Sequence, residues 1–242
     1  MRFDLHIHTC LSPCASLDMA PLAVVKRARE VGLHGIAVVD HNSGLNAPAW
    51  YDASRQVGLQ CLYGLEITTL EEIHVLAIFD TVENALAMTE VVYAALPTKT
   101  NAPDIFGDQP VVNCAGEIDF LEERLLSAPS TLALATLREE IFMRQGLFIA
   151  AHVDRPVFSF FSQLGVMSGN EGFDACEISV NSSCEQWRSR TGDLPLMRNS
   201  DAHYLEDIGR AWSEADIDTL NVQQLRHALQ TQNVRCHLKT RI

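Results

Sequence analysis

The chain has 242 residues, of which 47% are hydrophobic and 20% are charged, and its formal net charge is −13. This composition is typical of a globular protein and excludes wholesale disorder, and the length suits one α/β domain with a single core. An acidic surface repels phosphate backbones, so the net charge disfavours a nucleic-acid polymer as partner.

The sequence favours a cytoplasmic protein with no membrane association. Its first residues, MRFDLHIHTC, carry histidines and an aspartate where the apolar core of a secretory signal would lie. No apolar run reaches the length of a membrane span. Seven cysteines, an odd number scattered along the chain, do not form a disulfide framework. We expect a single domain over residues 1–242, and the sequence does not indicate its oligomeric state.

The predicted secondary structure alternates short strands with amphipathic helices. Seven apolar runs have the length and residue types of strands: 2–8, 35–40, 60–67, 74–79, 147–152, 175–180 and 196–200. Helical patterns separate several of them, and Asn221 is expected to cap the last helix. The link 68–73 is too short for a helical crossover, so the strands on either side of it pair antiparallel or lie irregularly. The pattern predicts a parallel α/β sheet or a barrel.

Residues 97–130 interrupt this alternation. The stretch contains four prolines, shows no clean hydrophobic period and has few strand-forming residues. Long segments of this kind in a compact domain are usually functional loops, so we expect a lid or insertion at the active site.

The first strand carries two histidines. Phe3, Leu5 and Ile7 alternate with Asp4, His6 and His8, so both imidazoles are expected on one face, within reach of one metal ion. Asp4 would share that face and orient an imidazole. A hydrogen-bonded pair of core histidines would explain a lone His-x-His equally well.

Further polar residues mark the ends of later strands. Asp40, His41 and Asn42 follow an apolar run, although residues of these types also suit a plain turn. Glu66 lies inside an apolar run, where a carboxylate needs a cation or strong hydrogen bonds. The others at strand starts and ends are His74, His152, Asp201 and His203. Six of the nine histidines occupy such places, and this distribution predicts a metal site at one end of the sheet.

Together these motifs resemble the polymerase-and-histidinol-phosphatase (PHP) family of metal-dependent phosphoesterases. The motifs that carry the resemblance run in family order: DLHIHT (4–9), VDHN (39–42), GLEI (64–67), HVL (74–76), AH (151–152) and SDAH (200–203). The resemblance implies a distorted seven-stranded (β/α) barrel with two or three divalent ions, which could be zinc, iron or manganese.

The resemblance also implies which residues hold each ion. The first ion would take two imidazoles and two carboxylates: His6, His8, Glu66 and Asp201. Glu66 would bridge to a second ion held by His74 and His152. His41 and His203 would contribute to a third.

One position departs from the family pattern. The family usually has an Asp or His for the third ion just after the first motif, whereas this chain reads CLSPC over 10–14. Cys14 would replace it as a thiolate, which zinc or iron accepts. The alternative is that Cys14 is a small residue in a tight turn and the third site is vacant.

Paired metal ions are suited to the hydrolysis of a small phosphate monoester or diester, because they activate water and neutralise phosphoryl charge. The substrate would then be a small phosphorylated molecule. Arg155 and Arg198 are the arginines best placed to bind its phosphate, and Asp40 or Asp154 would transfer a proton, a choice that the sequence leaves open.

Two other functions fit the same residues. A metal-bound hydroxide would also attack the carbonyl of an amide, and an amide substrate would not need the arginines. A metal-loaded accessory module that binds a ligand without turnover is the alternative outside the enzymes.

Overall fold

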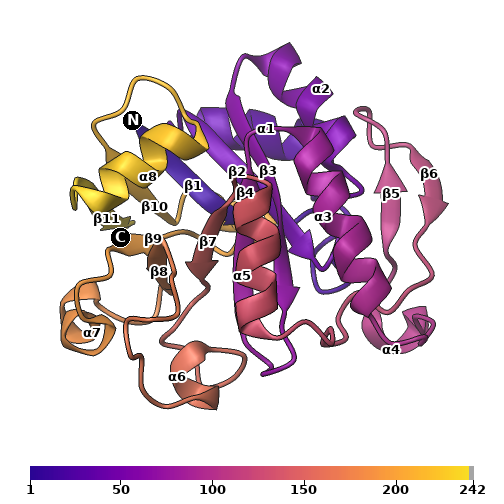
Figure 1. Cartoon of the computed structure of the whole chain (residues 1–242). Coiled ribbons are helices and arrows are strands. Elements are labelled where there is room, and N and C mark those ends of the chain that lie inside the picture. Colours follow the sequence, from indigo (N-terminus) through magenta and orange to yellow (C-terminus); the bar gives the residue numbers. More distant parts are fainter. Residues whose placement is uncertain (240–242) are drawn as a thin grey trace.

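Nine strands form one sheet in the computed structural model, which describes residues 1–239 (Figure 1). Their order across the sheet is β11-β10-β1-β2-β3-β4-β7-β8-β9. Their bounds are β1 (Arg2–Ile7), β2 (Gly35–His41), β3 (Gln60–Thr68), β4 (His74–Phe79), β7 (Leu147–Ala150), β8 (Ala175–Ile178), β9 (Leu196–Arg198), β10 (Ala211–Ala215) and β11 (Val234–Leu238). The main helices are α1 (Pro21–Glu30), α2 (Ala47–Val57), α3 (Val82–Ala95), α5 (Leu134–Met143), α6 (Phe160–Gln163), α7 (Cys184–Thr191) and α8 (Val222–Gln230).

All seven predicted strands form, and the short link 68–73 joins β3 to β4 as an antiparallel pair. The structure adds β10 and β11, which the sequence did not indicate. β10 pairs antiparallel with β1, and β11 pairs antiparallel with β10. Neither strand is an apolar run: β11 reads VRCHL and no residue in it is fully buried. Their pairing depends on the neighbouring strand rather than on a hydrophobic pattern of their own.

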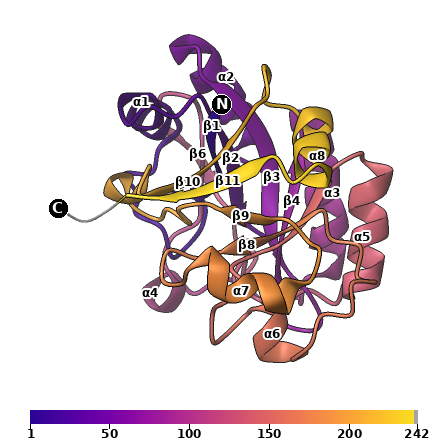
Figure 2. The ribbon, with the colours of Figure 1, turned by 90° about the vertical axis from the view of Figure 1, so that its left-hand side faces the viewer.

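The sheet curls until its two ends meet, which makes a nearly closed barrel. Figure 2 shows β10 and β11 running close to β9, the strand at the other end of the sheet order. The Ser213 hydroxyl on β10 donates to the Arg198 carbonyl on β9 and accepts from the Arg198 N–H, at 2.9 Å each. A parallel bridge between Ile7 and Ala202 closes the barrel at the carboxyl end of β1, opposite β2. The expected PHP-type barrel is confirmed as a fold class, with two additional strands.

Two apolar clusters cover the two faces of the sheet. The inner cluster fills the barrel with side chains such as Leu5, Leu62 and Ile149, and α8 covers the end near the strand amino termini. The outer cluster lies between the strands and the helices α1, α2, α3 and α5. As expected, Asn221 caps α8, and its side chain accepts the Gln224 N–H at 2.8 Å. The inner core does not fill the other end of the barrel, near the strand carboxyl termini, where polar residues lie.

The strict alternation expected for β1 is wrong. Phe3 and Leu5 belong to the inner cluster, but Ile7 belongs to the outer one. The pairing with β2 shifts register between Asp4 and Ile7, and such an irregularity re-aims the side chains that follow it. Leu5 points into the barrel, so in an unbroken strand His6 and His8 would point out of it. The register shift instead turns both histidines toward the barrel interior.

The insertion over residues 97–130 contains α4 (Pro103–Phe106) and the hairpin of β5 (Pro110–Val112) and β6 (Ile118–Leu121). Gly107, with φ of +96°, passes so close to the loop after β1 that an added Cβ would lie 2.4 Å from the Pro13 carbonyl oxygen. The insertion therefore borders the loop that carries Cys14. Its action as a lid stays a prediction.

Within residues 1–239, no helix combines the length and apolar character needed to cross a membrane.

Gly64 on β3 allows the close approach of β4. A Cβ at this position would lie 2.1 Å from the Ala77 carbonyl oxygen, a backbone atom that cannot rotate away. We expect Gly64→Ala to lower the free energy of unfolding by at least ~2 kcal/mol, as overpacking of a rigid core does. Urea denaturation followed by circular dichroism measures this.

The matched control is Gly35→Ala on β2, where the closest atom, at 2.5 Å, is the mobile tip of Leu220. Its cost should be smaller. Equal stability of wild type and Gly64→Ala would show that β3 and β4 can separate without penalty.

Candidate metal centre

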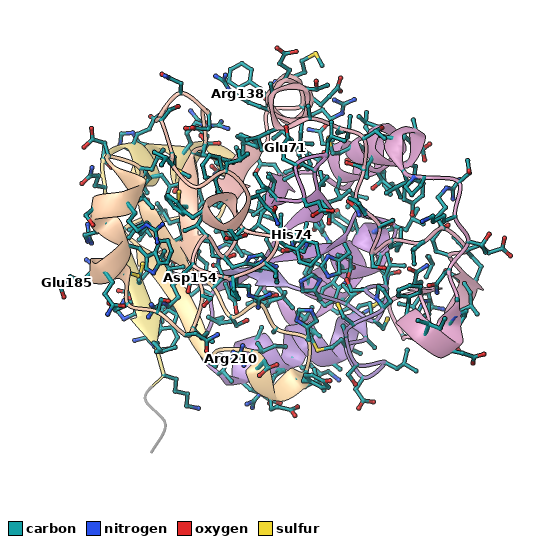
Figure 3. All side chains as sticks on the ribbon, turned by 90° about the horizontal axis from the view of Figure 1, so that it is seen from below. Glu71, His74, Arg138, Asp154, Glu185 and Arg210 are labelled. Atoms are coloured by element: carbon teal, nitrogen blue, oxygen red, sulfur yellow. The ribbon has the colours of Figure 1, made fainter. Side chains whose placement is uncertain are left out.

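Imidazoles and carboxylates converge inside the barrel at the carboxyl ends of the parallel strands. In Figure 3, which looks at this end, His74 lies near the middle of the molecule. Three groups have ligand atoms within 4.8 Å of one another: His6, His8 and Asp201; His41, Glu66 and His74; and His8, His41 and His203. The structure thus brings together the residues that the sequence singled out one by one.

Glu66 is at the centre of this cluster and is buried. Its Oε1 lies 2.9 Å from both His74 Nδ1 and His152 Nε2, and its Oε2 lies 3.1 Å from His41 Nδ1. Burial alone would raise the pKa of Glu66, but the nearby imidazoles, led by His74, outweigh it and hold that pKa well below its usual range. The carboxylate is therefore ionised, with its two oxygens facing different histidines.

His6, His8 and Asp201 form a second, adjoining group. The Nε2 atoms of His6 and His8 are 3.2 Å apart, and each lies 3.3 Å from Asp201 Oδ1. Burial lowers the pKa of His8, yet hydrogen bonds to Asp201 and Glu66 reverse this and raise it to about 9. The group therefore favours added positive charge, which either a proton or a metal ion supplies.

On the side away from Asp201, the Nδ1 atom of each imidazole is hydrogen-bonded to a residue that fixes the position of its proton. His6 Nδ1 donates to Glu177, whose Oε2 is 2.9 Å away. His8 Nδ1 donates to Ser12 Oγ at 2.9 Å, because the Ser12 hydroxyl itself donates to Asp40 at 2.6 Å. Because each Nδ1 donates outward, the two Nε2 atoms face each other and the Asp201 carboxylate, where each can hold either a proton or a metal ion. Only a cation makes this arrangement favourable.

Glu177 holds an imidazole although the sequence did not indicate it, and Asp4 does not have the position predicted for it. Glu177 on β8 is buried and also accepts the backbone N–H of His152 and the side-chain amide of Asn199. A carboxylate inside the short buried strand ACEI was the available signal, the same one that identified Glu66. Asp4 instead accepts backbone N–H groups of His6 and Ser200. The expectation that Asp4 orients an imidazole is therefore wrong, because the register shift in β1 moves it away.

Cys14 lies beside the candidate third group. His203 Nδ1 donates to the Asp201 carbonyl at 3.0 Å, so its Nε2 accepts from the Cys14 thiol, 3.1 Å away. Burial of the sulfur and the negative charge of Glu66 raise the pKa of that thiol to about 12. Asp18, the next acidic residue, is exposed. Cys14, and not Asp18, is thus the candidate ligand of this loop that contacts a residue of the third group.

Three residues of the site have a strained backbone. Asn42, His152 and Asp201 have φ of +53°, +26° and +51°, values that non-glycine residues rarely adopt. Each costs about 1 to 3 kcal/mol, which packing must offset. Asn42 is held by hydrogen bonds to the carbonyls of Leu126 and Ala128 in the insertion. The strain aims His152 and Asp201 into the cluster.

The two arginines predicted to bind phosphate lie in different places. Arg155 pairs with Asp201 through its Nη2 and is 38% exposed, so it borders the mouth of the site. Arg198 is buried, and its Nη2 donates to the Ser182 carbonyl before α7. The structure therefore places Arg155 at the cluster and directs Arg198 toward α7. Phosphate binding by either arginine stays a prediction.

The carboxylates of both residues that were predicted to transfer a proton already accept hydrogen bonds. Asp40 accepts from Thr9 and Ser12, at 2.6 to 2.7 Å. Asp154 accepts from the N–H and the hydroxyl of Ser179, at 2.8 and 2.6 Å. Proton transfer by either aspartate stays a prediction, and the contacts favour positioning roles.

The donor set fits divalent transition metals. Imidazole nitrogens and carboxylate oxygens suit zinc, iron and manganese, and a thiolate would add a preference for zinc or iron. His152 Nδ1 is buried without a hydrogen-bond partner among the described residues, and its Nε2 faces Glu66.

Comparison with known proteins identifies the family. The model of the PHP domain matches residues 4–140, more than half of the chain, and a PHP-associated model matches residues 185–234. The chain belongs to the PHP domain family. It is 40% identical over 67 residues to a PolC-type DNA polymerase III from Caldanaerobacter subterraneus and 41% over 73 residues to that of Lacticaseibacillus paracasei. These matches cover 27% and 29% of this chain and only 5% of each polymerase.

Solved structures share the fold of this PHP domain at low sequence identity. The lesion-specific endonuclease EndoQ from Pyrococcus furiosus has a TM-score of 0.70 at 18% identity, covering 95% of this chain and 56% of the endonuclease. A proposed metal-dependent phosphoesterase from Bifidobacterium adolescentis has a TM-score of 0.59 at 20% identity, covering 96% of both chains. An amidohydrolase from Chromobacterium violaceum has a TM-score of 0.59 at 15% identity, covering 97% and 98%.

The expectation drawn from net charge, which disfavoured a nucleic-acid polymer, is wrong. Endonuclease Q, which has this fold, was solved with a 27-mer DNA duplex carrying an abasic lesion at its active site, with a TM-score of 0.66 and 19% identity over 95% of this chain and 56% of that one. The net charge is a sum over the whole surface, whereas the potential at the barrel mouth depends on its own arginine and on any bound cations.

Glu177 provides a test of how the cluster is held. Glu177→Ala removes the acceptor of His6 Nδ1, and we expect it to weaken metal affinity about 10- to 100-fold, as the loss of such orienting partners does. Calorimetric titration with Zn²⁺ or Mn²⁺ measures this. The control Glu185→Ala changes an exposed glutamate on α7 and should leave affinity unchanged. An affinity in Glu177→Ala equal to wild type would contradict the role.

Proposed function

We propose that this PHP domain binds two or three divalent metal ions and hydrolyses phosphate ester bonds in nucleic acid. The observation that carries the proposal is the pair of Nε2 atoms of His6 and His8, which lie 3.2 Å apart and face two buried carboxylates. The PHP family membership and the activities named for EndoQ and for the PolC-type polymerases support a nucleic-acid substrate.

The ligand sets that we propose follow the three adjoining groups. One ion is held by His6, His8, Glu66 and Asp201. A second is held by Glu66, His74 and His152, because both imidazoles lie 2.9 Å from the same carboxylate oxygen. When bound, such paired ions supply a hydroxide at neutral pH and neutralise charge on the phosphoryl oxygens.

The surrounding residues position these ligands and the substrate. Glu177 orients His6, and Asp40 acts through Ser12 to orient His8. Arg155 reaches Asp201 from a partly exposed position, where its guanidinium can also contact a phosphate oxygen. A cation at the mouth favours an anionic phosphodiester over a neutral amide, and it gives a reason to prefer phosphoester hydrolysis to amide hydrolysis.

A third ion would use His41 and His203, with the Cys14 sulfur as its additional ligand. The thiol proton now directed at His203 would be displaced by the metal ion, as metal binding to cysteine requires.

The function is tested by the double change His6→Ala/His8→Ala. We expect wild type to cleave a labelled oligonucleotide in the presence of Mn²⁺ or Zn²⁺, and the double variant to lose the first ion and all metal-dependent cleavage. Elemental analysis and gel electrophoresis of the products measure the two effects, and circular dichroism checks the fold.

The control His34→Ala/His227→Ala removes two histidines outside the cluster and should retain both metal and cleavage. Full metal content in the His6→Ala/His8→Ala variant would overturn the ligand assignment. Wild-type protein that is loaded with metal but cleaves neither single-stranded nor duplex DNA or RNA would overturn the proposed reaction.

Cys14→Ser tests the third ion. A serine hydroxyl is a poor replacement for a soft thiolate, so we expect the metal content to fall by about one ion per chain. Cys14→Asp, the usual family choice, should restore it. Elemental analysis measures the content, and Cys114→Ser, which changes a cysteine on the insertion, is the control. Equal metal content in wild type and Cys14→Ser would show that Cys14 is a turn residue without a metal role.

A further inference from the structure

An aromatic side chain lies against the metal centre from outside the ligand set. Phe158 follows the AHVDR segment, and its φ of +53° places a bulky residue in the left-handed region. The loop is fixed on both sides of it: the Phe158 carbonyl accepts the His74 N–H at 3.0 Å, and Ser159 caps α6. Such strain persists only where the surroundings impose it, and it is found mostly at functional sites.

The strained backbone holds the ring in a defined place. The Phe158 ring stacks on the His74 imidazole, with 4.9 Å between centroids and 16° between planes. His74 is itself 2.9 Å from Glu66. One ring layer thus separates Phe158 from the carboxylate that we propose to bridge two ions.

The ring does not serve only to cover His74. Phe158 is 42% exposed, although His74 beneath it is buried. An aromatic ring with one face on a buried partner and much of its remaining surface in water is available for stacking. Arg155, three residues earlier, pairs with Asp201 at the same mouth, so a cation for phosphate and an exposed ring lie on one short loop.

A second aromatic and basic group lies on the helices that follow this loop. On α6, Phe161 lies 5.4 Å from Trp187 of α7, measured between ring centroids. The guanidinium of Arg190 lies over both rings, at 4.7 and 4.5 Å from their centroids. Aromatic rings next to cations are the combination that binds single-stranded nucleic acid without reading its sequence.

We propose that Phe158 is a specificity-determining residue, a platform on which a nucleobase next to the scissile phosphate stacks. The inference rests on the phosphodiesterase function proposed above and adds the feature of the substrate that the site recognises. A phosphate held by the metal centre and Arg155 leaves the adjoining nucleoside to extend toward Phe158. Stacking is tolerant of sequence because every base has a π-face, so the platform selects unpaired or splayed nucleotides over baseless phosphodiesters.

The test uses two substrates of equal length and charge: a short single-stranded oligonucleotide, and a phosphodiester of furanose units that carries no bases. The main variant is Phe158→Leu, which keeps an apolar cover on His74 but has no π-face. Phe158→Trp restores an aromatic ring. Val157→Ala, which changes an exposed neighbour on the same loop, is the matched control. The metal-loaded proteins are compared by KM for cleavage and by Kd from fluorescence anisotropy.

Loss of one base–aromatic stack corresponds to about 5- to 150-fold in affinity. We expect Phe158→Leu to raise KM and Kd of the oligonucleotide by a factor in this range and to change those of the baseless substrate by less than about twofold. Phe158→Trp should return the oligonucleotide values to those of wild type. Val157→Ala should leave both substrates unchanged.

Equal changes for the two substrates, or no change for either, would overturn the stacking role. Wild type that binds the oligonucleotide no better than the baseless substrate would also overturn it. Failure of the proposed function looks different: wild type cleaves neither substrate, while the Kd values still report whether binding depends on the bases and on Phe158.

Discussion

The ionised Glu66 carboxylate, buried among imidazoles, is the constraint on which the rest of this domain depends. A bare carboxylate in the interior costs several kcal/mol or more, so the fold must supply hydrogen-bond donors or a cation around it. His41, His74 and His152 approach its two oxygens to within 3.1 Å. Because these histidines come from β2, from β4 and from the segment after β7, the need to satisfy Glu66 links segments that are far apart in the sequence.

Much of the architecture serves to hold those segments at one place. The register shift in β1 turns two histidines into the barrel, and the closure of β1 on the segment after β9 brings Asp201 beside them. The inner core and α8 fill the barrel beneath the cluster. Residues with positive φ occur among the cluster itself, so the packing of the barrel compensates locally unfavourable backbone.

An outer layer of hydrogen bonds determines which atoms the imidazoles present. Glu177 and the Ser12–Asp40 pair engage the Nδ1 atoms of His6 and His8, which leaves both Nε2 atoms for the interior. Without this layer, either nitrogen of each ring could carry the proton and the cluster would lack a defined charge pattern. The orientation of the ligands is therefore as much a property of the fold as their proximity.

The sequence by itself determined the seven strands of the barrel and the polar residues that gather at one of its ends, because strand periodicity and a carboxylate in an apolar run are local signals. It did not reveal β10 and β11, whose pairing depends on neighbours rather than on their own composition. Only the tertiary structure showed that Glu177 rather than Asp4 accepts the imidazole N–H of His6, that Arg155 and Arg198 diverge, and that Phe158 lies on His74. These outcomes depend on a shift of register, on the course of two loops and on one strained backbone angle, and none of these has a periodic signature in the chain.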